Sequence, residues 1–334
     1  MKLIRQFQIL GILFFSVKLL SQAGFPVNTS ALQKINPSVH GLNLNSKAGV
    51  LFSNLNYGEG LSAENNYLYG NVAFEKLNFS IGIDVNSLSI NQLGLKQNDI
   101  DLSYAYKLKI GYDTYFLGGV DIGITSQLVD RSRLVFQDQL NLQLGTIVGT
   151  SIDPLAEIKP STNYFDIGAS GLIYNEKFLV GIHLAHLNSP NISFNKETII
   201  KKDIAITFLG AIELDINPYG RGIIPENTFF FGTIYGVFNG ETTRYVSSQE
   251  IQLSNFSIGL MQSLVSFNQN SSLDFGVLST LSFENFLLNL SYSFQPESDT
   301  TNTPSIFEIG LRFNFDRFLS NRRGYYKRLN TDNL

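Results

Sequence analysis

Histidine is the residue type in this chain best suited to bind a metal ion or transfer protons near neutral pH. The sequence has three, His40, His183 and His186, and the last two stand in VGIHLAHLNSP, residues 180–190. On a strand, residues three apart point to opposite faces, so this pair would not share a metal ion. A Ser–His–acid hydrolase needs partners that nothing here fixes, although His186 falls on the apolar face of its strand. We therefore expect no catalytic residue, no metal ligand and no cofactor.

Acidic residues recur on the polar side of several alternating segments and outnumber the bases there. One interpretation is that these charges pair across neighbouring strands and fill a closed interior, because an unpaired buried charge is costly. The other is an acidic channel that passes cations. We favour the filled interior, because leucines also fall on this side. The acids are Asp84, Asp101, Asp121, Asp166, Glu213, Asp215, Asp274 and Glu308, the bases are Lys107, Lys109 and Arg312, and the leucines are Leu117, Leu172 and Leu278.

The segments that carry these residues alternate with a period of two, which is the pattern of a β-strand. In PSIFEIGLRFNF, residues 304–315, Phe307, Ile309 and Leu311 share one side while Glu308 and Arg312 share the other. The same alternation recurs at 79–89, 99–110, 203–216 and 285–294. Each segment has the length that a tilted strand needs to cross a bilayer.

The composition indicates which solvent each side of these strands meets. Charged residues make up 16% of the 334 residues, against about 25% in a typical soluble protein, while aromatic residues reach 13%. The apolar side therefore suits lipid, and the sheet must close because lipid offers no hydrogen bonds to an open edge. We predict an all-β fold, a transmembrane antiparallel β-barrel over residues 45–315. An even strand number is usual, so we expect about 14 strands, with 12 as the alternative.

The two ends of the chain carry different signals. Residues 1–21 combine Lys2 and Arg5 with an apolar stretch, the pattern of a signal peptide, and we place cleavage at 21–23. Residues 22–44 would form an N-terminal periplasmic segment. Residues 316–334 would form a basic periplasmic tail, either solvated beside anionic headgroups or docked on a periplasmic partner. A net charge of −4 argues against nucleic-acid binding. The candidate docking residues of the tail are Arg322, Arg323, Lys327 and Arg328.

Two stretches resemble the PorP/SprF family of Bacteroidetes outer-membrane proteins. One is YFDIGASGLIYNEKFLVGIHLAHLNSPNISF, residues 164–194, and the other is KINPSVHG, residues 34–41. Ser38 replaces the alanine usual in the family, and the usual Gln-Trp that follows is absent because the chain has no Trp. The positions that match the family are Asn36, Pro37, Gly41, Asp166, Gly168, Gly171, Tyr174, Gly181, His186, Pro190 and Asn191.

The resemblance implies an outer-membrane location and a role in the type IX secretion system and gliding machinery. It implies a protein that is not an enzyme and that helps to secrete or attach a large surface protein, usually an adhesin, recognised through its C-terminal domain. Partners would then be outer-membrane lipid, that client and components of the periplasmic secretion ring. The alternative function is a passive diffusion channel or small-molecule transporter. An adhesin encoded next to this gene would favour the first hypothesis.

Overall fold

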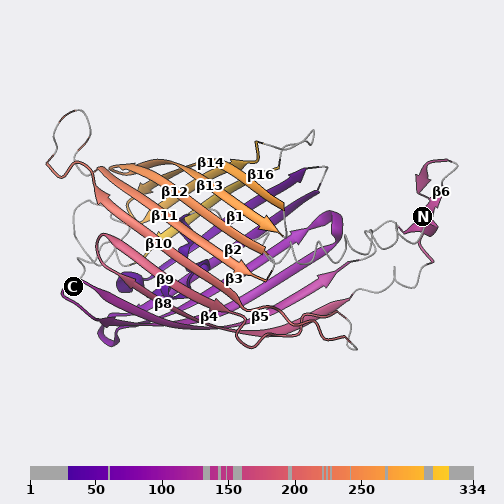
Figure 1. Cartoon of the computed structure of the whole chain (residues 1–334), viewed down its shortest axis with the longest axis horizontal. Helices are drawn as coiled ribbons and strands as arrows, with labels where there is room; N and C mark the ends of the chain where they lie inside the picture. The colour runs from indigo at the N-terminus through magenta and orange to yellow at the C-terminus, as the bar shows by residue number, and fades with distance from the viewer. Residues whose placement is uncertain are drawn as a thin grey trace.

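The computed structural model describes residues 29–315 apart from 59–60, 131–135, 142–143, 148, 153–159, 195–197, 220–221, 223–224, 226–227, 241, 268–269 and 297–303. The predicted signal peptide, residues 22–28 and the basic tail with Arg322, Arg323, Lys327 and Arg328 lie outside the described residues. Within the described part, the strands form a closed wall around a lumen (Figure 1).

Fourteen strands of the described chain form one closed antiparallel barrel, which confirms the predicted fold and strand number. The barrel closes where β1 pairs with β16, from Lys47 opposite Asn314 to Asn56 opposite Ser305. Each other wall strand pairs with its neighbours in the chain, and β5 pairs with β8. The wall strands are β1 (Lys47–Gly58), β2 (Leu61–Phe74), β3 (Phe79–Ile90), β4 (Leu95–Lys109), β5 (Tyr115–Val129), β8 (Ser161–Tyr174), β9 (Phe178–Ala185), β10 (Ala205–Asp215), β11 (Thr228–Asn239), β12 (Thr242–Leu253), β13 (Phe256–Phe267), β14 (Asn270–Phe283), β15 (Phe286–Phe294) and β16 (Ser305–Asn314).

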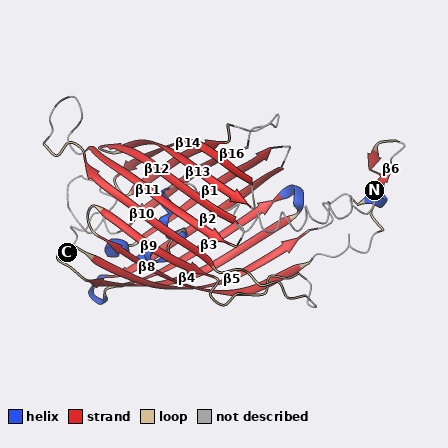
Figure 2. Cartoon of the chain, viewed as in Figure 1, coloured by secondary structure: helices blue, strands red, loops and turns tan. Residues whose placement is uncertain are grey.

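The remaining described elements are short (Figure 2). A hairpin of β6 (Leu140–Asn141) and β7 (Thr146–Ile147) lies in the connection between β5 and β8. Among the described residues, no helix has the length and apolar character needed to span a membrane. The 3-10 helices are η1 (Thr29–Lys34), η2 (Pro37–Leu44), η3 (Glu75–Leu77), η4 (Asn91–Leu93) and η6 (Gln137–Gln139).

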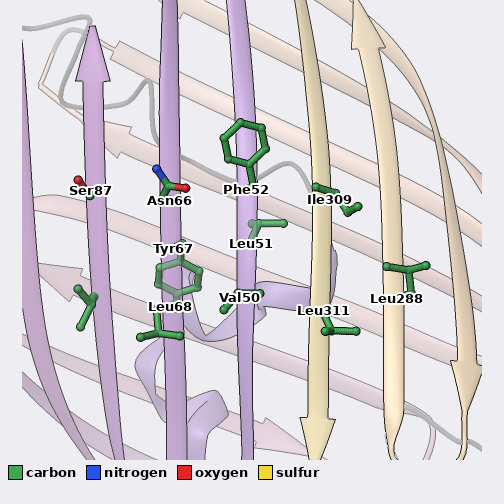
Figure 3. Close-up of a pocket in the computed structure, with 11 residues that line it drawn as sticks. Val50, Leu51, Phe52, Asn66, Tyr67, Leu68, Ser87, Leu288, Ile309 and Leu311 are labelled. Carbon is green, nitrogen blue, oxygen red and sulfur yellow. The ribbon is translucent and has the colours of Figure 1, made fainter.

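The wall alternates between an exposed outer face and a buried inner face, as the period of two requires. On β3, the outward residues Ile81 and Ile83 are both 46% exposed, whereas the inward residue Ser80 is fully buried. Beside the seam between β16 and β1, outward apolar side chains border a groove of about 540 Å³ (Figure 3). Val50, Leu68, Ile309 and Leu311 are among the residues that line it. The outer face therefore has the character expected of a lipid-facing surface.

The two ends of the barrel differ in their connections. At the termini end, where β1 begins and β16 ends, tight turns contain Asn78, Ser254 and Glu284 with φ values of 55°, 56° and 48°. The opposite loop end carries the connections 130–160, 186–204 and 295–304, while 216–227 is the longer connection at the termini end. Because periplasmic turns of outer-membrane barrels are short and their outer loops long, we assign the termini end to the periplasm.

Residues 29–44, which we call the plug, lie inside the barrel. η2 packs on the inner faces of β2, β3, β4, β5 and β8, and Ser38 and His40 are fully buried. The sequence assigned residues 22–44 to an N-terminal periplasmic segment, and residues 29–44 of that segment pack against the inner face of the wall. Small inward residues of the wall leave room for it: an added Cβ at Gly82 would lie 2.5 Å from the His40 ring, and one at Gly119 would lie 2.6 Å from Ser38 Oγ.

Candidate functional site

The two stretches that resemble the family meet at one junction between the plug and the wall. Asn36 caps the N-terminus of η2, because its Oδ1 accepts a hydrogen bond from Ser38 N at 3.0 Å. Its Nδ2 donates to the carbonyl oxygens of Gly171 on β8 at 3.3 Å and Ile182 on β9 at 3.0 Å. One buried amide therefore ties the plug to two neighbouring strands, and Pro37 follows it as the first residue of η2.

Close packing at this junction explains two of the matched glycines. A Cβ added at Gly181 would lie 2.8 Å from Asn36 Nδ2, and one added at Gly41 would lie 2.9 Å from Leu117 Cδ2. Both distances are shorter than ordinary contacts, so only glycine fits without a shift of the plug. Tyr174 completes the junction, since its hydroxyl accepts a hydrogen bond from Asn43 N at 3.4 Å.

One side of the plug is apolar. Leu32, Ile35 and Val39 are 8%, 2% and 2% exposed and pack into the main hydrophobic cluster of the lumen. This cluster continues across the inner faces of β5 and β8 to β14, so the lumen interior is filled here as the sequence favoured. Its wall members are Tyr115, Leu117, Leu172, Tyr174, Leu179, Leu209, Ala211, Phe231, Tyr235, Val237, Val246, Met261 and Leu278.

The other side of the plug is polar and faces β2 and β3. His40 Nε2 lies 2.8 Å from Asp84 Oδ2, and Tyr67 donates its hydroxyl to the other oxygen of the same carboxylate. Asn71 Nδ2 donates to the carbonyl oxygens of His40 at 3.0 Å and Asn45 at 2.7 Å. These groups form a buried hydrogen-bonded network, which fixes the plug's rotation and depth.

Lys34 places a cation on this polar side. Its Nζ donates to Asn86 Oδ1 at 2.7 Å and lies 4.8 Å from the centre of the Tyr67 ring. Burial lowers the pKa of Lys34 to about 8, although the nearby carboxylate of Asp99, among others, opposes this shift. The lysine is therefore a desolvated charge held opposite the acidic part of the wall.

A second group of matched residues lies at the base of the 186–204 loop. His186 Nδ1–H donates to Asp166 Oδ2, and burial lowers the pKa of the His186 imidazole while this hydrogen bond opposes the shift. The sequence placed His186 on the apolar face, and this is wrong: β9 ends at Ala185, and His186 has a φ of 63°. The left-handed residue turns the ring toward the inward-facing Asp166.

The other residues of this group shape the same region. Asn191 Oδ1 accepts hydrogen bonds from Ser193 N at 3.1 Å and Ile200 N at 2.9 Å, and Lys202 N donates to Pro190 O at 2.9 Å. These bonds fold the loop back on itself. Gly168, which faces the Asp121 carboxylate, lies between this loop base and the plug junction.

The inward acids use several kinds of partner. Glu308 accepts hydrogen bonds from Ser53 at 2.9 Å and Ser291 at 3.1 Å. His183 Nε2 lies 3.3 Å from Asp121 Oδ1. Hydroxyl and imidazole groups are therefore partners of these two acids, whereas the sequence suggested charged side chains of neighbouring strands. Asp215 and Lys109 are exposed rather than packed in the lumen. In the described part of the chain, no group of three or more His, Asp and Glu residues could hold a metal ion.

Sequence reasoning missed the partners of the plug. Ser38 Oγ lies 2.8 Å from Ser170 Oγ, and the His40–Asp84–Tyr67 network was not anticipated. Asp84 could have been suspected, because it stands on the inward side of a lipid-crossing strand. Nothing in the local pattern indicates that its partner lies 44 residues away in a segment without alternation.

Comparison with known proteins places the chain in a family. A search of curated proteins found no significant match. Among solved structures, similar folds occur in the Acinetobacter baumannii outer membrane protein Omp33 (10% identity, TM-score 0.44, 82% of this chain and 100% of that one). They also occur in the P. putida toluene transporter TodX (10%, 0.48, 84% and 92%) and a Pseudomonas aeruginosa FadL homologue (9%, 0.48, 88% and 96%). At these identities the likeness concerns the fold alone. The family model of the type IX secretion system membrane protein PorP/SprF matches residues 29–313, and the chain therefore belongs to this outer-membrane family.

Proposed function

We propose that this protein is a non-enzymatic partner of the type IX secretion system that helps to secrete or attach a large surface protein, an adhesin, through the client's C-terminal domain. The observation that carries the proposal is the plug, whose residues Ile35 and Val39 are packed into the lumen at 2% exposure each. Because the chain's own segment occupies the lumen, we expect the protein to work through contacts on the outer surfaces of the barrel. The alternative function, a diffusion channel, would require this plug to leave.

The loop end offers a surface suited to such a client. Leu144, Ile147 and Ile152 in the β5–β8 connection are 71%, 60% and 89% exposed, and Ile199 in the 186–204 loop is 73% exposed. Figure 1 shows β6 beyond the end of the wall, away from the lipid-facing surface. Contiguous apolar patches exposed to water mark protein interaction sites, and Leu144, Ile147 and Ile152 are close together in the sequence. We assign the client contact to this part of the loop end.

The ends of the chain complete the proposal. The predicted signal peptide over 1–21 would deliver the chain across the inner membrane. The basic tail over 316–334 would lie in the periplasm, where Arg322, Arg323, Lys327 and Arg328 could meet anionic headgroups or the secretion ring. Deletion of 316–334 distinguishes contact with headgroups from docking on the secretion ring. Surface display of the client should fall only if the tail docks on the ring.

The surface proteome tests the proposal. Cells that lack the gene should lose a large surface protein from the protein set released by external protease and identified by mass spectrometry. A triple variant, Leu144→Ser with Ile147→Ser and Ile152→Ser, should lose the same protein while the barrel remains folded in the membrane. The matched control is Tyr219→Ser, which alters a side chain 79% exposed at the opposite end of the barrel. It should leave surface display unchanged.

Two outcomes would contradict the proposal at different levels. An unchanged surface proteome in cells without the gene would refute the function itself. Loss of the client without the gene, combined with normal display by the triple variant, would retain the function and refute the assigned contact.

A further inference from the structure

Polar side chains interrupt the outer face of the wall on β12 and β13, which lie side by side in Figure 1. Ser247 and Gln249 of β12 and Gln262 of β13 occupy outward positions of their strands and are partly exposed. Along β13, Gln262 lies between Leu260 and Leu264, which are 58% and 40% exposed on the same face. The polar group therefore stands inside the apolar surface that faces lipid, not at its edge.

These side chains form a short hydrogen-bonded ladder. Gln262 Nε2 donates to Gln249 Oε1 at 3.2 Å, and Gln249 Nε2 donates to Ser247 Oγ at 2.6 Å. Ser247 and Gln262 are also directly opposite in the strand register. Each glutamine amide has two donor hydrogens and an acceptor oxygen with two lone pairs, so this ladder uses part of its hydrogen-bonding capacity.

The amides and their position along the strands distinguish this ladder from other outward polar side chains of the wall. Ser279 of β14 also lies between exposed apolar residues, Val277 and Leu281, but it carries a single hydroxyl and no amide. Asn66 and Asn98 lie on the part of β2 and β4 that leads to the loop end, beyond the apolar stretch. The ladder on β12 and β13 instead has exposed apolar neighbours on both sides, including Tyr245 and Ile251 on β12 at 38% and 46%. Amides in hydrocarbon are costly unless they find hydrogen-bond partners, so lipid alone is a poor neighbour for them.

We propose that this face, made of Ser247, Gln249 and Gln262 with the apolar residues around them, binds a second copy of the same chain within the membrane. The membrane fixes the depth and orientation of each barrel, so a two-fold axis along the membrane normal brings residues of equal depth together. A second copy presents its amides at the same depth in the membrane. Because an amide is both a donor and an acceptor, the amides of the two copies can hydrogen-bond to each other. Leu260, Leu264 and their apolar neighbours supply the surrounding contact.

Cysteine cross-linking in membranes tests the proposal, because the natural chain has no cysteine. Single variants Leu260→Cys and Leu264→Cys, which keep the amides, should give a disulfide-linked dimer on mild oxidation. Matched controls are Ile83→Cys and Leu102→Cys, which are paired in register on β3 and β4 on the opposite side of the wall. They should give little dimer at the same protein density.

A second variant tests whether the dimer depends on the glutamine amides. Gln249→Leu with Gln262→Leu in the Leu264→Cys background should lower the cross-linked fraction about tenfold, since membrane hydrogen bonds contribute measurably to association. Retention of the heat-modifiable band on a gel would show that this variant is folded. The proposal is overturned if β13 cysteines cross-link no better than the β3 and β4 controls. It is also overturned if they cross-link to a protein of a different mass, or if the leucine variant forms as much dimer.

Discussion

The inner wall of the barrel holds the plug by different interactions on its two sides. On the side of β5 and β8–β14, Leu32, Ile35 and Val39 pack among buried apolar residues. On the side of β2 and β3, His40 meets Asp84 in a hydrogen-bonded network. Burial of apolar area stabilises without regard to direction, whereas a hydrogen bond contributes little net energy and depends strongly on geometry. The apolar side therefore provides the strength of docking, and the polar side fixes the position of the plug.

The largest effect should come from the apolar side. Ile35→Ala leaves a cavity and should weaken docking of the plug by about 2–5 kcal/mol. Docking can be followed with Ser38→Cys, a side chain that is fully buried while the plug is in place. A water-soluble thiol reagent should label this cysteine at least about 30-fold faster when Ile35 is truncated.

The matched control for this variant is Ile83→Ala, which removes the same atoms from the outward face of β3. It should leave the labelling rate unchanged. Equal rates for Ile35→Ala and the parent would show that the apolar contacts do not hold the plug.

A smaller effect should come from the polar side. His40→Ala removes one partner of the buried Asp84 carboxylate and should cost about 1–3 kcal/mol. His40→Gln, which keeps a side-chain donor, should recover part of this cost. Labelling of Ser38→Cys measures both variants, and a larger effect than that of Ile35→Ala would reverse the division of roles between the two sides.

The junction itself should respond to added volume. Gly181→Ala brings a Cβ to 2.8 Å from Asn36 Nδ2 and should cost about 1 kcal/mol through overpacking. The control is Gly70→Ala, whose Cβ would meet its nearest neighbour at an ordinary 3.6 Å. If the clash is with Asn36, adding Gly181→Ala to Asn36→Ala should cost less than it does alone, and full additivity would refute this explanation.

The last effect is confined to alkaline pH and should come from the proton on Lys34. Because burial lowers its pKa from 10.5 to about 8, the docked plug binds this proton less tightly than the undocked chain does. The penalty for burying the charge is therefore present below about pH 8 and disappears as the pH rises toward 10.5. Labelling of Ser38→Cys, corrected for the reactivity of a free thiol, should slow over this window, and Lys34→Met should abolish the trend. Faster labelling as the pH rises would mean that the attraction of the charged Lys34 to nearby acids outweighs its burial penalty.

The barrel could be predicted from the sequence because its determinants are local. Ile81 and Ile83 alternate with Ser80 and Gly82 within a few residues, and lipid outside forces closure of the sheet. His186 shows the limit of that reasoning, since parity holds only while the strand continues and β9 ends one residue earlier.

The plug could not be predicted in the same way. Its segment lacks the period of two, and its contacts join residues far apart in sequence, such as Asn36 and Ile182. The family resemblance singled out Asn36, Gly41 and Gly181 as positions, but only the fold brings them together.

The conductance of the purified full-length protein in planar bilayers tests the central claim most directly. A lumen filled by the plug, with Leu117 and Leu172 at 0% and 1% exposure among its neighbours, should pass little current. We predict rare and small openings under conditions in which a porin control conducts steadily. Stable openings of porin size in the full-length protein would contradict the plugged barrel and favour the diffusion channel.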